Sequence, residues 1–339
     1  MGAKLTTKQF NELLSTLSSE YVIYGPTRFV GGGTFSDTDR IRYGEIKTVE
    51  ELELNEKSDF SFKEVILPIT QTLFYYNEDE VVEAKGNTKK LLIFLRSCDM
   101  HAVRRIDEIY LGNRFKDHYY QTFRENTTFI VLGCDTSYSS CFCVDMETNR
   151  FDEYENYFHL ANDTIDFDAR TANIVEALTS LAISTDEAIT PQFVSSNEVR
   201  VTIPENLSLD IIKSTMWDEY SERCIACGRC NFVCPTCTCF SMQDIKYKDN
   251  EEAGERRRVW ASCQVHGFTD MAGGHAFRQK NGQKMRFKTL HKVYDFKKRY
   301  GYHMCVGCGR CDDICPEYIS FSGCINKLSE GMKEVNGND

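Results

Sequence analysis

Two similar stretches decide the fold of the C-terminal third of this chain: CIACGRCNFVCP at residues 224–235 and CVGCGRCDDICP at residues 305–316. Both follow the spacing C-x2-C-x2-C-x3-C-P. Three cysteines two residues apart wrap a loop around three corners of an iron–sulfur cubane, and the fourth, followed by proline, ligates the other cluster. The spacing predicts two [4Fe–4S] clusters with crossed ligands: Cys224, Cys227, Cys230 and Cys315 for the first, and Cys305, Cys308, Cys311 and Cys234 for the second.

Zinc is the alternative occupant of such cysteines. Structural zinc sites use paired C-x2–4-C knuckles, which supply two plus two ligands. Three evenly spaced cysteines with a trailing Cys-Pro, repeated in the chain, do not fit that plan. We therefore favour an iron–sulfur protein and keep a non-redox zinc-binding interaction module as a competing hypothesis.

The surroundings of the two motifs bear on their architecture. Residues 236–304 separate the copies, a much longer spacer than a minimal ferredoxin has. Helical patterns precede both motifs, at Leu207–Tyr220 and Leu290–Tyr300. These features predict a mainly helical two-cluster domain of the alpha-helical ferredoxin type. A compact β-α-β ferredoxin with a long insertion is the alternative.

The length and composition set further limits. The chain has 339 residues, enough for two domains, and its formal net charge of −11 disfavours nucleic acid binding. Its 16 cysteines are clustered and no apolar leader opens the sequence, which predicts a reducing, cytoplasmic setting. No apolar run approaches the roughly 20 residues that span a bilayer, so no membrane span is expected.

The first 205 residues hold only four cysteines and predict a mixed α/β domain. Buried strands at Lys90–Leu95 and Thr128–Leu132, with a helix at Met100–Tyr110 between them, predict a parallel sheet. Other expected elements are helices at Thr7–Glu20 and Ala172–Leu181, short strands at Tyr21–Tyr24 and Phe29–Val30, and a strand at Val199–Ile203. The predicted domains are 1–205 (α/β), 206–327 (ferredoxin-like) and a polar tail at 328–339.

The four N-terminal cysteines suggest a further site. Cys98 and Cys134 each follow a predicted strand, so they are expected at one edge of the parallel sheet. Cys141 and Cys143 lie in the loop just beyond. Their convergence would give a third [4Fe–4S] cluster, and buried structural thiols are the alternative. The adjacent oxygen donors that could replace one thiolate are Asp99 and Asp135.

Several residues near the motifs invite a role. The basic stretch Arg256–Arg299 could be a docking patch for an acidic redox partner, positive charge near anionic clusters, or a solvated face. Four further cysteines are left over: Cys237, Cys239, Cys263 and Cys324. Cys237 and Cys239 directly follow the first motif and are expected to pack beside the cluster, with ligation as the alternative. Candidates for hydrogen bonding or charge tuning are His101, His303, Arg229 and Arg310. No catalytic acid–base set and no G-x-G-x-x-G motif after a strand is found, so the chain is expected to lack an NADH or substrate site.

Three segments carry a family resemblance: LRSCDMHAVRRIDEIYL (95–111), GCDTSYSSCFCVDM (133–146) and RCIACGRCNFVCPTCTCF (223–240). They resemble electron-transfer subunits of a group that includes the β subunits of soluble sulfur-linked hydrogenases. The segments RRVWASCQVHGFTDMAGGHAFRQ (257–279) and MCVGCGRCDDICPEYISF (304–321) resemble the iron–sulfur electron-transfer subunits of anaerobic sulfite reductases in particular.

The resemblance implies a three-subunit sulfite reductase complex. A flavoprotein subunit would oxidise NADH, this iron–sulfur subunit would relay the electrons, and a siroheme subunit would reduce sulfite to sulfide. The alternative is an electron-relay β subunit of a hydrogenase or another oxidoreductase. These hypotheses differ in the partner and not in the chemistry of this chain.

Overall fold

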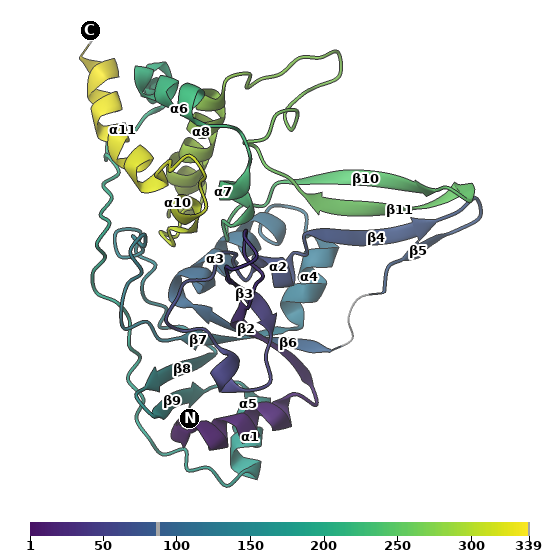
Figure 1. Ribbon diagram of the computed structural model, residues 1–339, viewed down its shortest axis with the longest axis vertical. Coiled ribbons are helices and arrows are strands. Elements are labelled where there is room, and N and C mark those ends of the chain that lie inside the picture. The colour runs from purple at the N-terminus through teal and green to yellow at the C-terminus, as the bar shows by residue number, and fades with distance from the viewer. Residues whose placement is uncertain (86–88, 338–339) are drawn as a thin grey trace. The chain divides into compact units, whose positions relative to one another are not determined.

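The computed structural model describes residues 1–85 and 89–337 (Figure 1). The chain divides into two compact units. Unit 1 comprises Met1–Pro68, Val82–Tyr138 and Thr148–Ser196. Unit 2 comprises Ile69–Val81, Ser139–Glu147 and the chain from Asn197 onward. The two units interleave along the chain and are not successive segments. The domain limits predicted from cysteine density, 1–205, 206–327 and 328–339, remain a prediction.

Unit 1 is built on a seven-stranded mixed sheet. The central strands β2, β6, β7 and β8 pair in parallel, and the flanking pairs β2–β3, β8–β9 and β1–β9 are antiparallel. The parallel core expected from the strand–helix–strand pattern is therefore present. In spatial order the strands are β1 (Gly2–Thr6), β9 (Thr164–Ala169), β8 (Asn156–Ala161), β7 (Thr127–Leu132), β6 (Lys90–Arg96), β2 (Tyr21–Phe29) and β3 (Arg40–Glu45).

The sequence explains the main helices of unit 1. Helix α1 (Thr7–Leu17) begins with a capping box in which Thr6 and Gln9 satisfy each other's backbone N–H groups. Its apolar stripe is buried in the sheet core, where the Phe10 ring lies 5.0 Å from that of Phe158. The other helices of the unit are α2 (Lys63–Ile66), α3 (Ser97–Tyr110), α4 (His118–Glu125), α5 (Ala172–Ser180) and a 3-10 turn at Val49–Glu51.

The chain from Asn197 onward supplies the helices of unit 2. The predicted helix Leu207–Tyr220 is broken into 3-10 turns at Leu209–Lys213 and Thr215–Trp217, followed by α6 (Asp218–Arg223). The helix predicted to end at Tyr300 is longer than expected. It runs through α8 (Asn281–Leu290), a π-helical turn at His291–Asp295 and α9 (Phe296–Tyr300). The remaining helices are α7 (Arg229–Phe232), α10 (Arg310–Asp313) and α11 (Phe321–Asn336).

Two features of this part of the chain differ from the prediction. The spacer between the motifs contains a long antiparallel hairpin, β10 (Phe240–Tyr247) with β11 (Asn250–Trp260), which joins β4 (Thr70–Tyr76) and β5 (Val81–Glu83) in a four-stranded sheet (Figure 1). The strand expected at Val199–Ile203 is wrong, because that segment is irregular. The two-motif region is thus helical around the motifs but carries a β-hairpin between them.

Candidate metal centre

The two cysteine motifs adopt the same backbone shape. Ala226 and Gly307, at matching positions, have φ of 55° and 63°. Each donates its N–H to the sulfur of the first cysteine of its motif, Ala226 to Cys224 at 3.4 Å and Gly307 to Cys305 at 3.5 Å. Peptide N–H groups aimed at thiolate sulfur stabilise cysteine-ligated clusters and tune their potentials.

A second pair of matching residues lies where each motif loop ends and a short helix begins. Gly228 and Gly309 have φ of 77° and 71°, and α7 and α10 begin directly after them. This left-handed conformation favours glycine, since a Cβ would be strained there. Both motif loops are therefore closed by the same left-handed step, which fixes the direction of the third cysteine.

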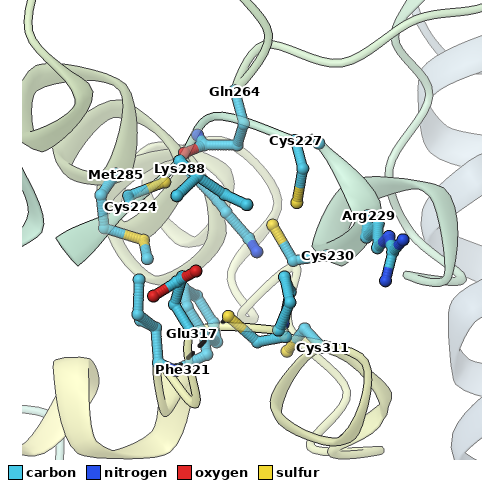
Figure 2. A pocket seen from close by; sticks show the side chains of 15 residues that line it. Cys224, Cys227, Arg229, Cys230, Gln264, Met285, Lys288, Cys311, Glu317 and Phe321 are labelled. Atoms are coloured by element: carbon cyan, nitrogen blue, oxygen red, sulfur yellow. Dashed lines mark hydrogen bonds between the residues drawn. The ribbon is translucent and has the colours of Figure 1, made fainter.

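The first ligand set lines one pocket (Figure 2). Cys224, Cys227 and Cys230 come from the first motif, and Cys315 comes from the second. The pocket encloses about 480 Å³, part of it open to solvent, and Cys311 also borders it. Burial raises the pKa of the Cys224 thiol, and the neighbouring thiols of Cys230, Cys227 and Cys315 raise it further. The fourth cysteine of the second motif thus lies with the first three cysteines of the first.

The second ligand set shows the reciprocal arrangement. Burial raises the pKa of Cys305 to about 12, and the charges of Cys234 and Cys308 contribute. Burial also raises the pKa of Cys311, with Asp312, Cys308 and Cys234 among its charged neighbours. Cys234 of the first motif is therefore close to Cys305 and Cys311 of the second, and both of these are close to Cys308.

Two lysines inside unit 2 face these thiols. Lys288 and Lys292 are 3% and 2% exposed. Figure 2 shows the Lys288 amine pointing into the pocket, and its nitrogen lies 4.9 Å from the centre of the Phe321 ring. Lys292 donates a hydrogen bond to Thr236 Oγ1 at 2.5 Å. Burial opposes both charges, yet the surrounding cysteines raise the pKa of each lysine.

This donor set fits iron–sulfur clusters. Cys315 lies with the three cysteines of the first motif, Cys234 lies near Cys305 and Cys311 of the second, and buried lysines accompany these thiols, as suits thiolate-ligated clusters of net negative charge. Within residues 1–85 and 89–337, no three His, Cys, Asp or Glu side chains converge as closely as a single metal ion needs. The thiols of a cubane stand farther apart than those around one zinc ion, where each Zn–S bond is about 2.3 Å.

The sequence contains a pattern that groups these buried lysines. Treating Arg256–Arg299 as a single basic stretch overlooks that pattern. Lys284, Lys288 and Lys292 follow each other at intervals of four, so they share one face of a helix. All three are buried. By contrast Lys297, Lys298 and Arg299 at the end of the same helix are exposed. The basic stretch thus combines buried charge beside the thiols with an exposed basic end.

The four N-terminal cysteines are divided between the units. Cys98 and Cys134 belong to unit 1, and the partly buried Arg96 side chain donates a hydrogen bond to Cys134 Sγ at 3.5 Å. Cys141 and Cys143 belong to unit 2. Cys141 Sγ donates to the carbonyl of Cys308 at 3.7 Å, while Cys143 Sγ accepts a hydrogen bond from the Asn197 amide at 3.6 Å.

The two oxygen donors proposed beside these cysteines have protein partners. Asp99 is fully buried and accepts a hydrogen bond from Tyr43 at 3.5 Å. Both carboxylate oxygens of Asp135 lie 2.8 Å from Nε2 of His159.

The histidines and arginines predicted to act beside the motifs differ in their hydrogen-bond partners and in their exposure. His101 Nε2 is bonded to the carbonyl of Arg150 at 2.7 Å, and burial lowers its pKa to about 4. His303 Nδ1 is bonded to the carbonyl of Val293 at 2.9 Å. Neither of these contacts is to a thiol. Arg310 is buried, whereas Arg229, which is among the residues that line the pocket in Figure 2, is exposed.

Comparison with known proteins assigns a domain to this region. Residues 223–319 match the 4Fe-4S dicluster domain. The dicluster domain contains both motifs, the β10–β11 hairpin and the helix that carries Lys288 and Lys292.

Over its full length the chain is similar to the sulfhydrogenase 2 subunit beta of Pyrococcus furiosus. The identity is 27% over 345 residues, covering 97% of this chain and 98% of the relative. The similarity therefore extends beyond the dicluster domain to unit 1. No helix among the described residues has the length and apolar character needed to cross a membrane.

Proposed function

We propose that the chain is an iron–sulfur electron-relay subunit of an oxidoreductase complex, of the kind represented by hydrogenase β subunits. The dicluster domain is proposed to hold two [4Fe–4S] clusters on the crossed ligand sets assigned from the motif spacing. Each cluster supplies reversible one-electron chemistry at a potential set by burial, charge and hydrogen bonds to sulfur.

One observation carries this proposal: a single buried cation serves both thiol groups. The Lys288 amine points into the pocket of the first ligand set and interacts electrostatically with Cys230. It also interacts electrostatically with Cys311 and Cys234, which belong to the second set. Two redox centres that share one charged neighbour lie close together, as electron transfer between them requires.

The surroundings of the two sets suggest which end faces a partner. Cys227 and Ile225 of the first motif are exposed. The second motif is covered by the segment Ser139–Glu147, whose Phe142 N–H donates to the carbonyl of Gly307 at 2.8 Å. We expect electrons to enter or leave this chain through the first set.

A third [4Fe–4S] cluster is part of the proposal. Its ligands would be Cys98, Cys134, Cys141 and Cys143. The guanidinium of Arg96, which donates a hydrogen bond to Cys134 Sγ, supports the part of this site in unit 1, because it places positive charge beside a thiol. Iron and acid-labile sulfide should be measured on anaerobically purified protein. About twelve irons per chain, falling to about eight in Cys98→Ser, would support the third cluster, and about eight in both would exclude it.

The identity of the partner proteins divides the two candidate complexes. The full-length relative is a hydrogenase subunit by name, which favours a hydrogenase-type complex. The resemblance of residues 257–279 and 304–321 to anaerobic sulfite reductases favours a complex with an NADH-oxidising flavoprotein and a siroheme subunit that reduces sulfite. The comparisons with known proteins give no support to that second assignment.

Co-purification distinguishes these complexes. An affinity tag on the chromosomal copy of this chain, with anaerobic purification at low salt, would retain the native partners. A nickel–iron subunit would establish the hydrogenase-type complex, and siroheme absorption would establish the sulfite reductase. A colourless zinc-loaded chain without labile sulfide would overturn the electron-relay function.

A further inference from the structure

The long hairpin of unit 2 has one strand with an unpaired side. Strand β10 is the first strand in the order β10–β11–β4–β5, so it pairs with β11 on one side only (Figure 1). An edge strand of this kind presents a row of N–H and C=O groups that can pair with another chain. The outer side of β10 is therefore a template for strand pairing.

The register of the hairpin shows which backbone groups of β10 face outward. The Ala261 N–H donates to the carbonyl of Cys239 at 2.9 Å, and these two residues continue the register in which Phe240 pairs with Trp260. Successive residues of a strand direct their backbone N–H and C=O groups to opposite sides, so the odd-numbered residues of β10 face β11. The even-numbered residues face outward: Phe240, Met242, Asp244 and Lys246.

The four outward residues of β10 are not covered. All four are exposed, and within residues 1–85 and 89–337 no group is hydrogen-bonded to their outward N–H or C=O groups. Strand β3, an edge of the sheet in unit 1, differs in this respect. There the N–H of Ile41 donates to the Asp59 carboxylate at 3.0 Å, and the Asp59 N–H donates to the carbonyl of Ile41 at 2.8 Å.

We propose that the outer side of β10 is a dimerisation edge, on which β10 of a second copy of this chain pairs in the antiparallel direction about a two-fold axis. The two four-stranded sheets then form one continuous sheet. This inference goes beyond the electron-relay function and does not depend on it.

Charge favours a second copy as the occupant of this edge. Chains with a net charge of −11 repel one another, but residues 240–260 carry five acidic and five basic side chains. The acidic side chain of β10 itself, Asp244, already accepts hydrogen bonds from Nε and Nη2 of Arg256 at 2.6 and 2.7 Å. Two hairpins therefore meet without net repulsion, and a second β10 offers the same length and the same alternation of outward groups.

The outward residues also select the register of the pairing, because each must lie opposite an outward residue of the other copy. An axis at Gln243 places Phe240 opposite Lys246 and Met242 opposite Asp244. All four outward residues are then paired, and each pair exchanges two hydrogen bonds. The cation of Lys246 meets an aromatic ring, and no like charges lie opposite each other.

The two neighbouring registers are less favourable. An axis at Asp244 places two carboxylates directly opposite each other, which is destabilising. An axis at Ile245 brings Asp244 opposite Lys246, but these two are then the only outward residues of β10 that pair within the strand. A cross-strand charge pair contributes no more than a backbone hydrogen bond, so the register with more pairs is favoured.

The test uses the full-length, cluster-loaded chain under anaerobic conditions. Sedimentation equilibrium at increasing protein concentration should show a reversible monomer–dimer equilibrium. Hydrogen exchange on the same samples should show protection of β10 that increases with concentration, while β5 at the opposite edge of the sheet stays unchanged. A monomer at every concentration, or a dimer without protection of β10, would overturn the proposal. Protection of β10 only in the presence of co-purified partner subunits would overturn the second copy as the occupant.

A proline variant tests the outward N–H groups directly. Proline at an edge position whose N–H faces outward removes no hydrogen bond to the neighbouring strand, so Met242→Pro should keep the hairpin and the wild-type iron content. Its dimer dissociation constant should rise at least about tenfold, because each dimer loses two hydrogen bonds. Met242→Ala keeps the N–H and should dimerise as the wild type does. A proline variant that dimerises equally well would contradict strand pairing.

A pair of charge variants tests the two-fold axis and does not depend on proline. Gln243 lies opposite its own copy in the proposed register, so Gln243→Lys and Gln243→Glu should each weaken the dimer. An equimolar mixture of the two variants should dimerise more tightly than either alone, because lysine then lies opposite glutamate. A mixture no tighter than the separate variants would overturn the pairing. None of these results affects the electron-relay function, which is judged from the iron and labile sulfide of the chain.

Discussion

The two cysteine motifs share a sequence pattern and a backbone shape, but they differ in what surrounds them. The residue after the first cysteine is Ile225 in one motif and Val306 in the other, and their exposed fractions are 57% and 2%. The matching arginines, Arg229 and Arg310, are exposed and buried in the same order. The motif thus determines the loop, while the rest of the fold determines its access to solvent.

The cover over the second motif explains the difference. A Cβ on Gly307 would lie 2.5 Å from the carbonyl oxygen of Phe142, and one on Gly309 would lie 2.2 Å from that of Ser140. The corresponding Gly228 faces the side chains of Val265 and Ser262 instead. Backbone packed on backbone leaves no room to relax, so the second motif is held more rigidly than the first.

Adding one methyl group should break the covered motif. We expect Gly309→Ala to destabilise the holoprotein by about 3 kcal/mol, combining left-handed strain with a clash against the backbone of Ser140. Anaerobic thermal unfolding would measure the loss. Gly273→Ala is the control, since Gly273 has φ of 87° and nothing lies within 4 Å of its Cβ position. An equal loss in both variants would show that the cover contributes nothing.

The two motifs should differ in the rate at which a chelator removes their iron. A chelator should take iron from the exposed first ligand set at least about tenfold faster than from the covered second set, because local opening is easier where few contacts must break. Absorbance of the iron–chelate complex should show a fast phase of about four irons per chain from the first set, followed by a slower phase that includes the second set. Cys227→Ser should eliminate the fast phase, and Cys324→Ser should keep both. A single phase in the wild type would contradict the difference in access.

Removing one buried charge should change the potentials of the centres selectively. Lys292 interacts with Cys234 and Cys305 of the second set, whereas Lys288 interacts with both sets. A cation stabilises the reduced, more negative form, so its loss lowers the reduction potential.

For Lys292→Met we expect a decrease of about 60 mV in the second centre alone, a tenfold change for one electron. Lys288→Met should lower both potentials. Redox titration monitored by electron paramagnetic resonance would measure these shifts. Lys298→Met, on the exposed end of the same helix, should change neither. If Lys298→Met shifted a potential by the same amount, the effect of a lysine on the potentials would not depend on its burial.

The smallest expected effect is a change in stability that tests whether the two motif loops share the same backbone conformation. Ala226 holds the left-handed conformation that Gly307 holds in the second motif. Ala226→Gly should therefore stabilise the protein by about 0.5 kcal/mol, as relief of strain exceeds the entropy lost by glycine. Ala3→Gly in β1, where Ala3 pairs with Phe167, should destabilise it instead, since a strand interior disfavours glycine. Chemical denaturation of both variants would give the two signs.

Much of this architecture could be predicted because short-range signals carried it. The apolar runs at Lys90–Leu95 and Thr128–Leu132 predicted the parallel core of unit 1, and the cysteine spacing predicted that Cys315 lies with the first three cysteines of the other motif. Both are local patterns with a fixed geometric meaning. The assignment of individual cysteines to clusters remains a prediction that the arrangement of thiols supports.

What the sequence did not reveal depends on long-range packing. The segment Ser139–Glu147 covers the second motif through backbone contacts, which leave no pattern of side chains to read. The β10–β11 hairpin escapes prediction because charged residues dominate its second strand, NEEAGERRRVW. The lysines of α8 resemble a solvated face, since only the position of the distant cysteines explains their burial.

The pocket in Figure 2 also constrains how the protein is made. Its wall begins at Cys224 and is completed only by Cys315 and Phe321, near the end of the chain. During synthesis the first three cysteines leave the ribosome long before the fourth, so the pocket does not exist while translation proceeds. Cofactor delivery must therefore wait until the chain has been made at least through Phe321, and a chain truncated before Cys315 would offer the assembly machinery an open loop and not a site.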